Sequence, residues 1–207
     1  MKRMSWLVVA LLTATGCVIE TDNEAGADAS ASAQQPPGAG PAARPQPPDL
    51  TLEVSLAQRA VNVYRGGQPI GSYPAAVGST EWPTPTGEWT ISQVIFNPRW
   101  LPPKDEEWAE DEKTAEPGAR DNPLGVVQLV YDAPNSIHGT NEPQSLGKAV
   151  SHGSVRVSNN VGVGLARLVM RAGGASQDDA WIENALRNRT ERAEVIIPNP
   201  VPIRVVE

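Results

Sequence analysis

The sequence predicts a mainly β domain with two short helices. Two observations support this: the 207 residues include 20 prolines and 18 glycines, and apolar side chains alternate with polar ones in several short segments. Prolines and glycines favour turns, and the alternation is typical of half-buried strands. A chain of this size supports one ordinary domain with a tail. We therefore expect a folded domain over residues 49–207, after a signal over residues 1–16 and a linker over residues 17–48.

A hairpin is expected at the start of the folded domain. Apolar residues alternate over residues 50–56, and the pattern resumes at Val61. The pair Gly66-Gly67 then supplies a two-residue turn, because glycine adopts the positive φ angles that such turns require. The next strand is expected over residues 68–73.

Further strands follow from the same kind of pattern. They are expected over residues 89–93, 126–131, 155–157, 194–197 and 201–206. Pro198, Pro200 and Pro202 confine the C-terminal segments to a sheet edge or a bend, because proline lacks the N–H that a central strand needs.

Two helices are predicted in the C-terminal third of the chain. The first covers residues 161–171, where apolar residues recur at helical spacing and Asn159 or Asn160 supplies the N-cap. The second begins after Ser176, with two aspartates in its first turn, where a negative charge is favourable.

The N-terminus carries an export signal. Two basic residues precede an apolar run over residues 6–12, and small residues then lead into Cys17, the single cysteine of the chain. The pattern resembles a bacterial lipoprotein signal, and a plain signal peptide with an incidental cysteine is the alternative. We expect an exported protein held in the cell envelope by lipid on Cys17 and facing the periplasm, on the outer membrane if the host is Gram-negative. The linker is rich in proline, alanine and glycine, which predicts disorder.

Composition excludes several classes of function. A net charge of −7 argues against a nucleic-acid partner, which needs a basic face. One cysteine and two histidines leave no internal disulfide and too few ligands for a zinc site. No nucleotide or flavin motif occurs, so we expect no cofactor and no metal, and we expect a monomer.

An acidic segment over residues 104–120 interrupts the β pattern. Its charges favour a solvated insertion or flap, with Trp108 held against the folded domain. Calcium binding is the alternative, but the spacing of the carboxylates does not match an EF-hand loop.

The residues with catalytic potential cluster in one short window. Both histidines precede glycine, in the pairs His138-Gly139 and His152-Gly153, and Ser154 follows the second pair. A serine nucleophile needs a base and amide donors for the oxyanion, and His138 and the amides near Gly153 supply both. Two ordinary histidines in turns are the alternative. No G-x-S-x-G motif occurs, which argues against an α/β-hydrolase.

The same window lies within a longer set of motifs. Residues 122–125 and 137–159 form its centre, and further short motifs lie in order on either side, at residues 73–74, 77–78, 84–87, 97–103 and 201–205. Together they resemble the L,D-transpeptidase catalytic domain family of the YkuD type over nearly all of residues 49–207.

This resemblance implies a fold and a reaction. The fold would be a β-sandwich or mixed sheet in a bacterial envelope enzyme. The reaction would transfer the acyl group of the third residue of a peptidoglycan tetrapeptide to the enzyme, with release of D-Ala, and then to an amine of another stem, which forms a 3–3 cross-link. Some relatives attach proteins to the wall, exchange D-amino acids or hydrolyse such bonds.

The resemblance also assigns roles to individual residues. His138 matches the family base, and the carbonyl of Gly139 matches the group that orients it. Ser154 stands where the family has its nucleophilic cysteine. The rest of the pocket motif, which serves substrate and oxyanion, is matched by Ser151, His152, Gly153 and Arg156.

The exchange of cysteine for Ser154 leaves three functions open. A hydroxyl needs concerted proton removal by an aligned histidine, whereas a thiol ionises readily. Because His138 is retained, we favour an active serine acyl transferase and expect the two side chains within hydrogen-bond reach. The alternatives are a catalytically degenerate lipoprotein that binds peptidoglycan and a serine-dependent hydrolase of stem peptides.

Overall fold

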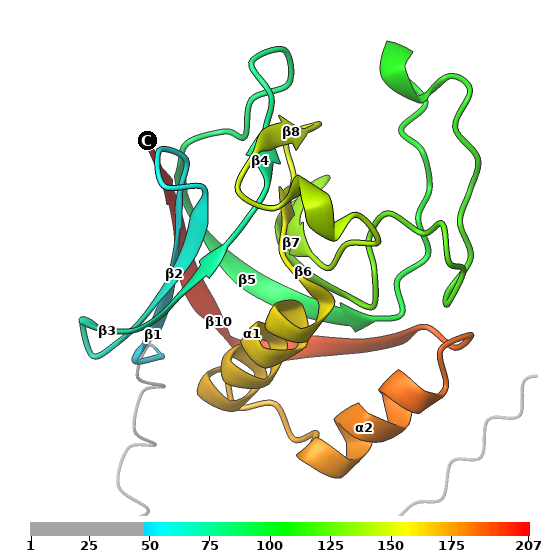
Figure 1. The fold of residues 1–207 in the computed structure, drawn as a ribbon. Helices are drawn as coiled ribbons and strands as arrows, with labels where there is room; N and C mark the ends of the chain where they lie inside the picture. Colours follow the sequence, from blue (N-terminus) through cyan, green and yellow to red (C-terminus); the bar gives the residue numbers. More distant parts are fainter. Residues whose placement is uncertain (1–47) are drawn as a thin grey trace, which may run out of the picture. The chain divides into compact units, whose positions relative to one another are not determined.

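An eight-stranded mixed sheet is the frame of the folded domain, and the computed structural model describes residues 48–207 (Figure 1). The strand order is β3-β2-β1-β10-β5-β6-β7-β9, and β4 pairs with β8 in a second, two-stranded sheet. The predicted mainly β class is confirmed. The predicted signal, Cys17 and nearly all of the linker lie outside the described residues.

The elements follow one another along the chain with short connections, apart from one long loop between β5 and β6. The strands are β1 Leu50–Ser55, β2 Ala60–Arg65, β3 Gln68–Pro74, β4 Val77–Gly78, β5 Gly87–Phe96, β6 Val127–Asp132, β7 Asn135–His138, β8 Ala149–Ser151, β9 Val155–Arg156 and β10 Ala193–Val206. The α-helices are α1 Asn159–Ala172 and α2 Asp179–Arg187, and two short 3₁₀ turns are η1 Glu107–Ala109 and η2 Pro143–Ser145.

The first hairpin has the predicted form. β1 pairs with β2 in antiparallel register, and Leu50 and Leu52 are fully buried on its apolar side. Gly66 and Gly67 join β2 to β3 with φ angles of 55° and 78°, the values that a two-residue hairpin turn requires. Local sequence chemistry therefore determines this part of the sheet.

Helix α1 packs against the sheet and supplies one side of the core (Figure 1). Its apolar face buries Leu165, Val169 and Met170, each at 1% exposure or less. Burial of side chains of this size stabilises the fold by about 1.5–3 kcal/mol each. The first turn of α1 is thereby fixed beside the ends of β7 and β9, where the candidate site lies.

Both α-helices begin at a residue whose side chain caps the helix N-terminus. The hydroxyl of Ser158 accepts a hydrogen bond from the N–H of Val161, so the predicted cap of α1 by Asn159 or Asn160 is wrong. Asp178 caps α2 and accepts from the N–H of Trp181 at 2.8 Å, which agrees with the predicted start after Ser176.

No helix within residues 48–207 is both long and apolar enough to span a bilayer.

The C-terminal strand corrects the edge prediction. β10 lies between β1 and β5, near the middle of the sheet, and not at an edge. Its register with β5 breaks between Ile196 and Val201, and its parallel pairing with β1 begins only at Ile203. Pro198 and Pro200 fall in this break, which agrees with the predicted bend, and Pro202 lies just before the pairing with β1 starts. A central strand therefore tolerates residues that lack an N–H at these positions.

The long connection between β5 and β6 contains the acidic segment, here called the flap and defined as residues 104–120. Asn122 closes the base of this connection, because it donates to the carbonyl of Pro98 at 2.7 Å. Asn97, at the end of β5, instead donates to the carbonyls of Ala185 and Glu191 at 2.7 and 3.0 Å and so joins β5 to α2 and the segment after it. Most of the flap is exposed, as predicted, and it rises beside β7 and β8 (Figure 1).

Candidate active site

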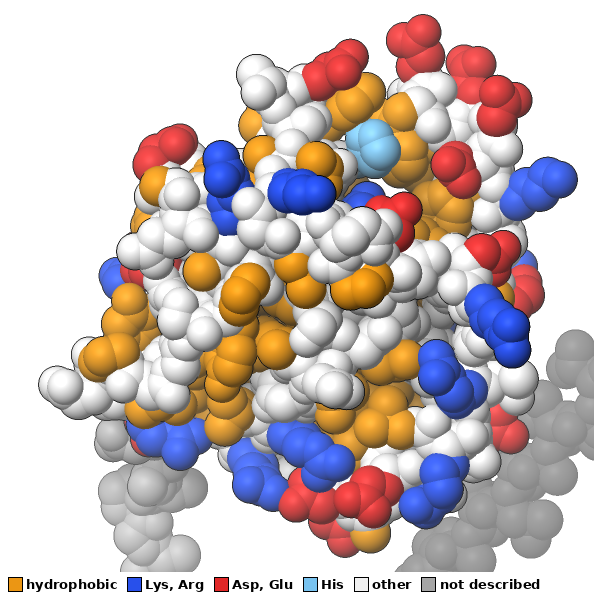
Figure 2. All heavy atoms as spheres, in the orientation of Figure 1, with side chains coloured by type: hydrophobic (Ala, Val, Ile, Leu, Met, Phe, Trp, Pro, Cys, Tyr) orange, Lys and Arg blue, Asp and Glu red, His pale blue; other side chains and the backbone are white. Residues whose placement is uncertain are grey.

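A pocket of about 1120 Å³ lies between the flap, β6, β7 and the turn before β9. In the space-filling view, a hollow with one visible histidine opens on this face, and acidic side chains gather beside it (Figure 2). Of the predicted site residues, the pocket is lined by His138, Ser151, His152, Ser154 and Arg156. The structure thus brings the end of β7 together with the segment from the end of β8 to β9.

His138 is the last residue of β7 and is 4% exposed. Its Nδ1 atom lies 2.6 Å from the carbonyl oxygen of Gly139. A carbonyl oxygen only accepts, so Nδ1 carries the proton of the neutral ring and Nε2 carries the lone pair. Burial lowers the pKa of His138 to about 4, against the raising effect of the Gly139 hydrogen bond, and the charge of Arg156 lowers it further. The ring is therefore a neutral acceptor at neutral pH.

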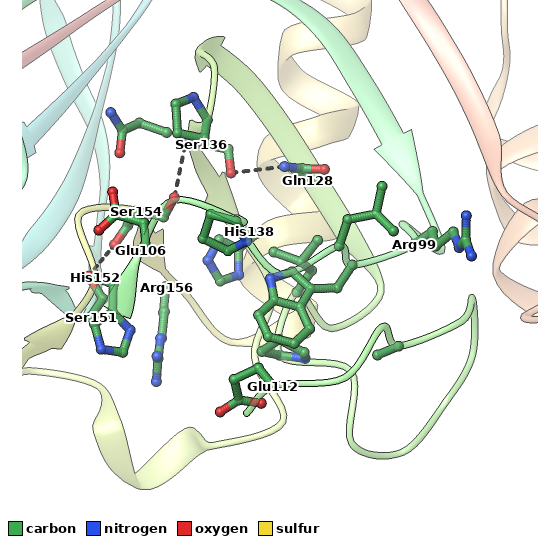
Figure 3. Close-up of a pocket in the computed structure, with 18 of the residues that line it drawn as sticks. Arg99, Glu106, Glu112, Gln128, Ser136, His138, Ser151, His152, Ser154 and Arg156 are labelled. Atoms are coloured by element: carbon green, nitrogen blue, oxygen red, sulfur yellow. Dashed lines mark hydrogen bonds between the residues drawn. The ribbon is translucent and has the colours of Figure 1, made fainter. Parts of the chain in front are cut away.

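Ser154 lies in the turn that precedes β9. Its Oγ accepts a hydrogen bond from the N–H of Ser136 at 3.3 Å, and the hydroxyl of Ser151 donates to its carbonyl (Figure 3). Among residues 48–207, no hydrogen bond joins Ser154 to His138, so the contact we expected is not formed. The hydroxyl instead turns toward the N–H of Ser136, although both side chains line the same pocket.

Gly153 joins His152 to Ser154, two residues that line the pocket. Gly153 has φ of +99°, in the region that favours glycine, and an added Cβ would lie 3.1 Å from the Oδ1 of Asn135. The turn that presents Ser154 therefore requires glycine.

His152 is held between two indole rings. Trp108 of the flap stacks on it with ring centroids 3.8 Å apart and planes at 1°, and Trp82 meets it edge-on at 4.6 Å. Desolvation and the charge of Arg156 lower the pKa of His152, while nearby carboxylates, Glu112 first among them, oppose that shift. The predicted contact of Trp108 with the folded domain is thus made at the candidate site itself.

Trp82 is positioned by the loop that follows β4. The N–H of Gly78 donates to the hydroxyl of Thr84 at 2.8 Å, and Thr84 is 3% exposed. An added Cβ on Gly78 would lie 2.3 Å from the carbonyl oxygen of Trp82, so the loop packs directly on the β4 backbone. Here too glycine permits a close approach that places a pocket residue.

Asn159 connects the start of α1 to both loops behind His138. Its Oδ1 accepts from the N–H of Val126 at 3.0 Å, and its Nδ2 donates to the carbonyl of Thr140 at 3.0 Å. Added Cβ atoms on Gly125 and Gly139 would lie 2.2 and 2.1 Å from that Oδ1. Both glycines are needed because the carboxamide lies between them.

Arg156 forms an ion pair across the pocket. Its Nη1 lies 2.6 Å from Oε2 of Glu142, and its side chain is 16% exposed while that of Glu142 is 51% exposed. Its backbone is fixed by reciprocal hydrogen bonds of 2.8 Å with Ala76. The guanidinium is therefore a partly desolvated cation on a rigid strand, and its partner is a carboxylate on a loop.

Four residues of the site were missed from the sequence: Ser136, Glu142, Asn159 and Trp82. Asn159 falls within the motif window, but its position before an apolar run indicates a helix cap at least as strongly. Ser136 acts through its backbone, which no sequence pattern reports. The contacts of Glu142 and Trp82 depend on how separate loops meet.

No cluster of three histidine, cysteine or carboxylate side chains suited to a metal ion occurs in the described part of the chain. The site consists of a buried imidazole, a hydroxyl, a guanidinium and backbone amides, which is a set suited to acyl chemistry.

The two similar proteins described here are both named as L,D-transpeptidases. The YqjB protein of Bacillus subtilis strain 168, named for the L,D-transpeptidases, is 32% identical over 122 residues, covering 56% of this chain and 64% of that protein. The YkuD protein of Bacillus licheniformis, named in the same way, is 34% identical over 119 residues, covering 57% of this chain and 59% of that protein. The chain thus spans less than two thirds of the length of these relatives.

Among solved structures, an L,D-transpeptidase from Mycobacterium tuberculosis H37Rv superposes with a TM-score of 0.46 at 18% identity, covering 77% of this chain and 58% of that chain. Residues 49–197 match the family described as YkuD, L,D-transpeptidase catalytic domain. Since this match covers more than half of the sequence, the chain belongs to the YkuD family of L,D-transpeptidase catalytic domains.

Proposed function

We propose that this domain is an acyl transferase that acts on peptidoglycan stem peptides through an ester intermediate on Ser154. The observation that carries the proposal is the hydrogen bond from Nδ1 of His138 to the carbonyl of Gly139, at 2.6 Å. It leaves Nε2 of a neutral imidazole as the acceptor in the pocket that Ser154 also lines. Family membership supplies the substrate class.

The proposed reaction has two halves with the same base. Oγ of Ser154 attacks the carbonyl carbon of the third stem residue while Nε2 of His138 takes the hydroxyl proton. The amide bond to D-Ala breaks, its nitrogen receives that proton, and an ester to Ser154 forms. An amine of a second stem then attacks the ester, His138 accepts a proton from the amine and returns one to Ser154, and a 3–3 cross-link is released.

The mechanism requires that Oγ of Ser154 and Nε2 of His138 come into hydrogen-bond contact when the substrate binds. Oγ of Ser154 accepts from the N–H of Ser136, so its own hydrogen is free to be donated. In the proposed reaction, rotation about the Cα–Cβ bond of Ser154 moves Oγ away from the N–H of Ser136 and toward Nε2 of His138. Catalytic hydrogen bonds often tighten only when substrate binds.

A direct test is to search for the ester. The full chain is incubated with a disaccharide tetrapeptide that ends in D-Ala, and intact-protein and peptide mass spectrometry are used to find an adduct on Ser154. We expect an adduct in the native chain and none in Ser154→Ala or His138→Gln. A folded native chain that forms neither adduct nor product would falsify the acyl-enzyme proposal.

A second function, binding of stem peptides without chemistry, is favoured by one observation. The described residues contain no hydrogen bond between Ser154 and His138, and Oγ of Ser154 accepts from the N–H of Ser136 instead. In that case retention of the chain on isolated peptidoglycan survives both Ser154→Ala and His138→Gln, and no adduct forms. A third outcome, release of shortened stems without cross-linked dimers, identifies water as the acceptor and the domain as a hydrolase.

We also propose that the protein is exported and anchored by lipid on Cys17, so that the domain faces the cell wall. The proposal rests on the basic and apolar run before the single cysteine. Replacing Cys17 with alanine should move the protein from the membrane fraction to the soluble fraction. Unchanged membrane association of that variant would count against the lipid anchor.

A further inference from the structure

The ion pair between Arg156 and Glu142 has a property that the proposed reaction does not use. The cation is on the rigid strand β9, beside the two histidines, and its charge lowers the pKa of both. Its partner is the more exposed of the two side chains, at 51% against 16%. The pair is thus a fixed positive site covered by a carboxylate that can move.

Glu142 is held by its backbone and not by its side chain. Its N–H donates to the hydroxyl of Thr140 at 3.0 Å, and its carbonyl accepts from the hydroxyl of Ser145 at 2.7 Å. Within residues 48–207, the recorded contact of its carboxylate is the one to Arg156. Displacement of this carboxylate therefore leaves the loop intact and costs only an ion pair with a half-exposed partner, a kind of interaction that contributes little to stability.

We propose that Arg156 is a subsite for the terminal carboxylate of the donor peptide and that Glu142 occupies this subsite until the donor displaces it. The inference rests on the proposed function, because it assumes a stem peptide in this pocket. A guanidinium binds a carboxylate through two parallel hydrogen bonds. The free terminal carboxyl of a donor peptide would therefore form an ion pair with Arg156 in place of the one that Glu142 forms. Glu142 then acts as a specificity residue, because a ligand without that carboxylate has no means of replacing it.

The charges around the pocket support Arg156 as the group that binds an anionic ligand. The flap carries several carboxylates on the lining, Glu106, Asp111 and Glu112 among them. An anionic ligand meets a net repulsive surface there, and the guanidinium beside the histidines offers it a compensating partner. Figure 3 shows Arg156 beside His152 and Ser154, close to the position of the proposed nucleophile. A carboxylate bound there would lie close to the proposed reaction centre.

The experiment measures binding and not turnover, in the Ser154→Ala background, so that it does not depend on catalysis. Two probes are compared by isothermal titration calorimetry: a tetrapeptide stem that ends in D-Ala with a free carboxyl, and the same peptide with that carboxyl as an amide. We expect the acid to bind more tightly than the amide. Glu142→Gln should tighten the acid about two- to five-fold and leave the amide unchanged, because the variant removes the carboxylate that competes for Arg156 in an ion pair whose acidic partner is half exposed.

A matched control is available in the same pocket. Glu116 pairs with Arg99 at 2.9 Å, and Arg99 also lines the pocket. Glu116→Gln frees a second arginine and removes the same charge, but it should not change the ratio of acid to amide affinity. Arg156→Lys, which keeps the charge and loses the forked geometry, should reduce that ratio, and circular dichroism checks that each variant is folded.

The outcomes separate the inference from the proposed function. Equal affinity for acid and amide in the native pocket, or a Glu142→Gln effect of the same size on both peptides, overturns the subsite even if Ser154 forms an adduct in the native chain. An acid preference that Glu142→Gln enhances supports the subsite even if no adduct ever forms. If neither peptide binds, the subsite and the proposed function both fall.

Discussion

At the residue scale, the chemistry of the site depends on how a hydroxyl differs from a thiol. A cysteine with a pKa near 8.5 is partly ionised at neutral pH, whereas serine must lose its proton during attack. The pKa of His138 is lowered to about 4, which makes the ring a weak base. A weak base serves a thiol better than a hydroxyl, because the thiol needs less help.

Ser154→Cys is therefore expected to raise reactivity toward acylating agents. With a carbapenem as the probe, we expect acylation at least 10-fold faster than in the native chain, because a thiolate is a far stronger nucleophile. The rate is read by intact-protein mass spectrometry at successive times. The double variant Ser154→Cys with His138→Gln should lose most of this gain, since the thiol then lacks its base.

If Ser154→Cys is folded and still inert, the pocket no longer accepts acyl donors, and binding without chemistry becomes the better account. If the thiol reacts equally fast with and without His138, the imidazole has no role as base.

At the element scale, the start of α1 determines where the carbonyl of Gly139 lies. Asn159→Ala removes the acceptor of Val126 N–H and the donor to Thr140 O, and each loss at a partly buried site costs about 1–3 kcal/mol. We expect a lower free energy of unfolding in urea. We also expect kcat to fall more than KM rises, since the Gly139 carbonyl orients His138.

Asn160, which follows Asn159 in the sequence, is a matched control. Asn160 lies on the same helical turn but is exposed, so Asn160→Ala should change the free energy of unfolding by less than about 0.5 kcal/mol. Equal effects of the two variants would show that helix propensity, and not the contact behind His138, is responsible.

The flap is the second element with a testable role. Trp108→Ala removes the ring that stacks on His152 at 3.8 Å. Because this stack joins the flap to His152, we expect faster tryptic cleavage at Lys104 and Lys113, with a change of less than about 1 kcal/mol in global stability. Cleavage rates that match those of the native chain would show that the stack does not hold the flap.

Elements with strong local signals could be predicted from the sequence, and those set by tertiary contacts could not. The hairpin at Gly66-Gly67 and the start of α2 after Ser176 follow from residues next to each other in the chain. The place of β10 within the sheet depends on β1, about 150 residues earlier, and the prolines predicted its bend but not its central position. Among the site residues, His138 and Ser154 were found by motif, whereas the orientation of Ser154 toward Ser136 depends on how two strands meet.

At the scale of the whole molecule, the buried His138 makes stability depend on pH. The pKa of its ring is 6.5 in the unfolded chain and about 4 in the folded one. Between these values the unfolded state binds more protons, so the stabilising contribution is fully present above pH 6.5 and is lost as the pH falls toward 4, by up to roughly 3 kcal/mol. Urea unfolding at pH 7 and at pH 4.5 measures the loss.

Carboxylates titrate in the same direction, so the native chain must be compared with His138→Gln. The lowered pKa of Glu53, for instance, adds to the loss in both proteins. We expect the native chain to lose more stability than His138→Gln between the two pH values. Parallel losses would mean that the imidazole is not buried in its neutral form.

The position of β10 determines when the large sheet can form relative to synthesis of the chain. The first hairpin joins the rest of the large sheet only through β1, and β1 pairs there with residues 203–206. A ribosome therefore synthesises about 150 residues after β1 before this sheet can close. Such non-local pairing slows folding, so we expect the large sheet to close late, after the local hairpins have formed.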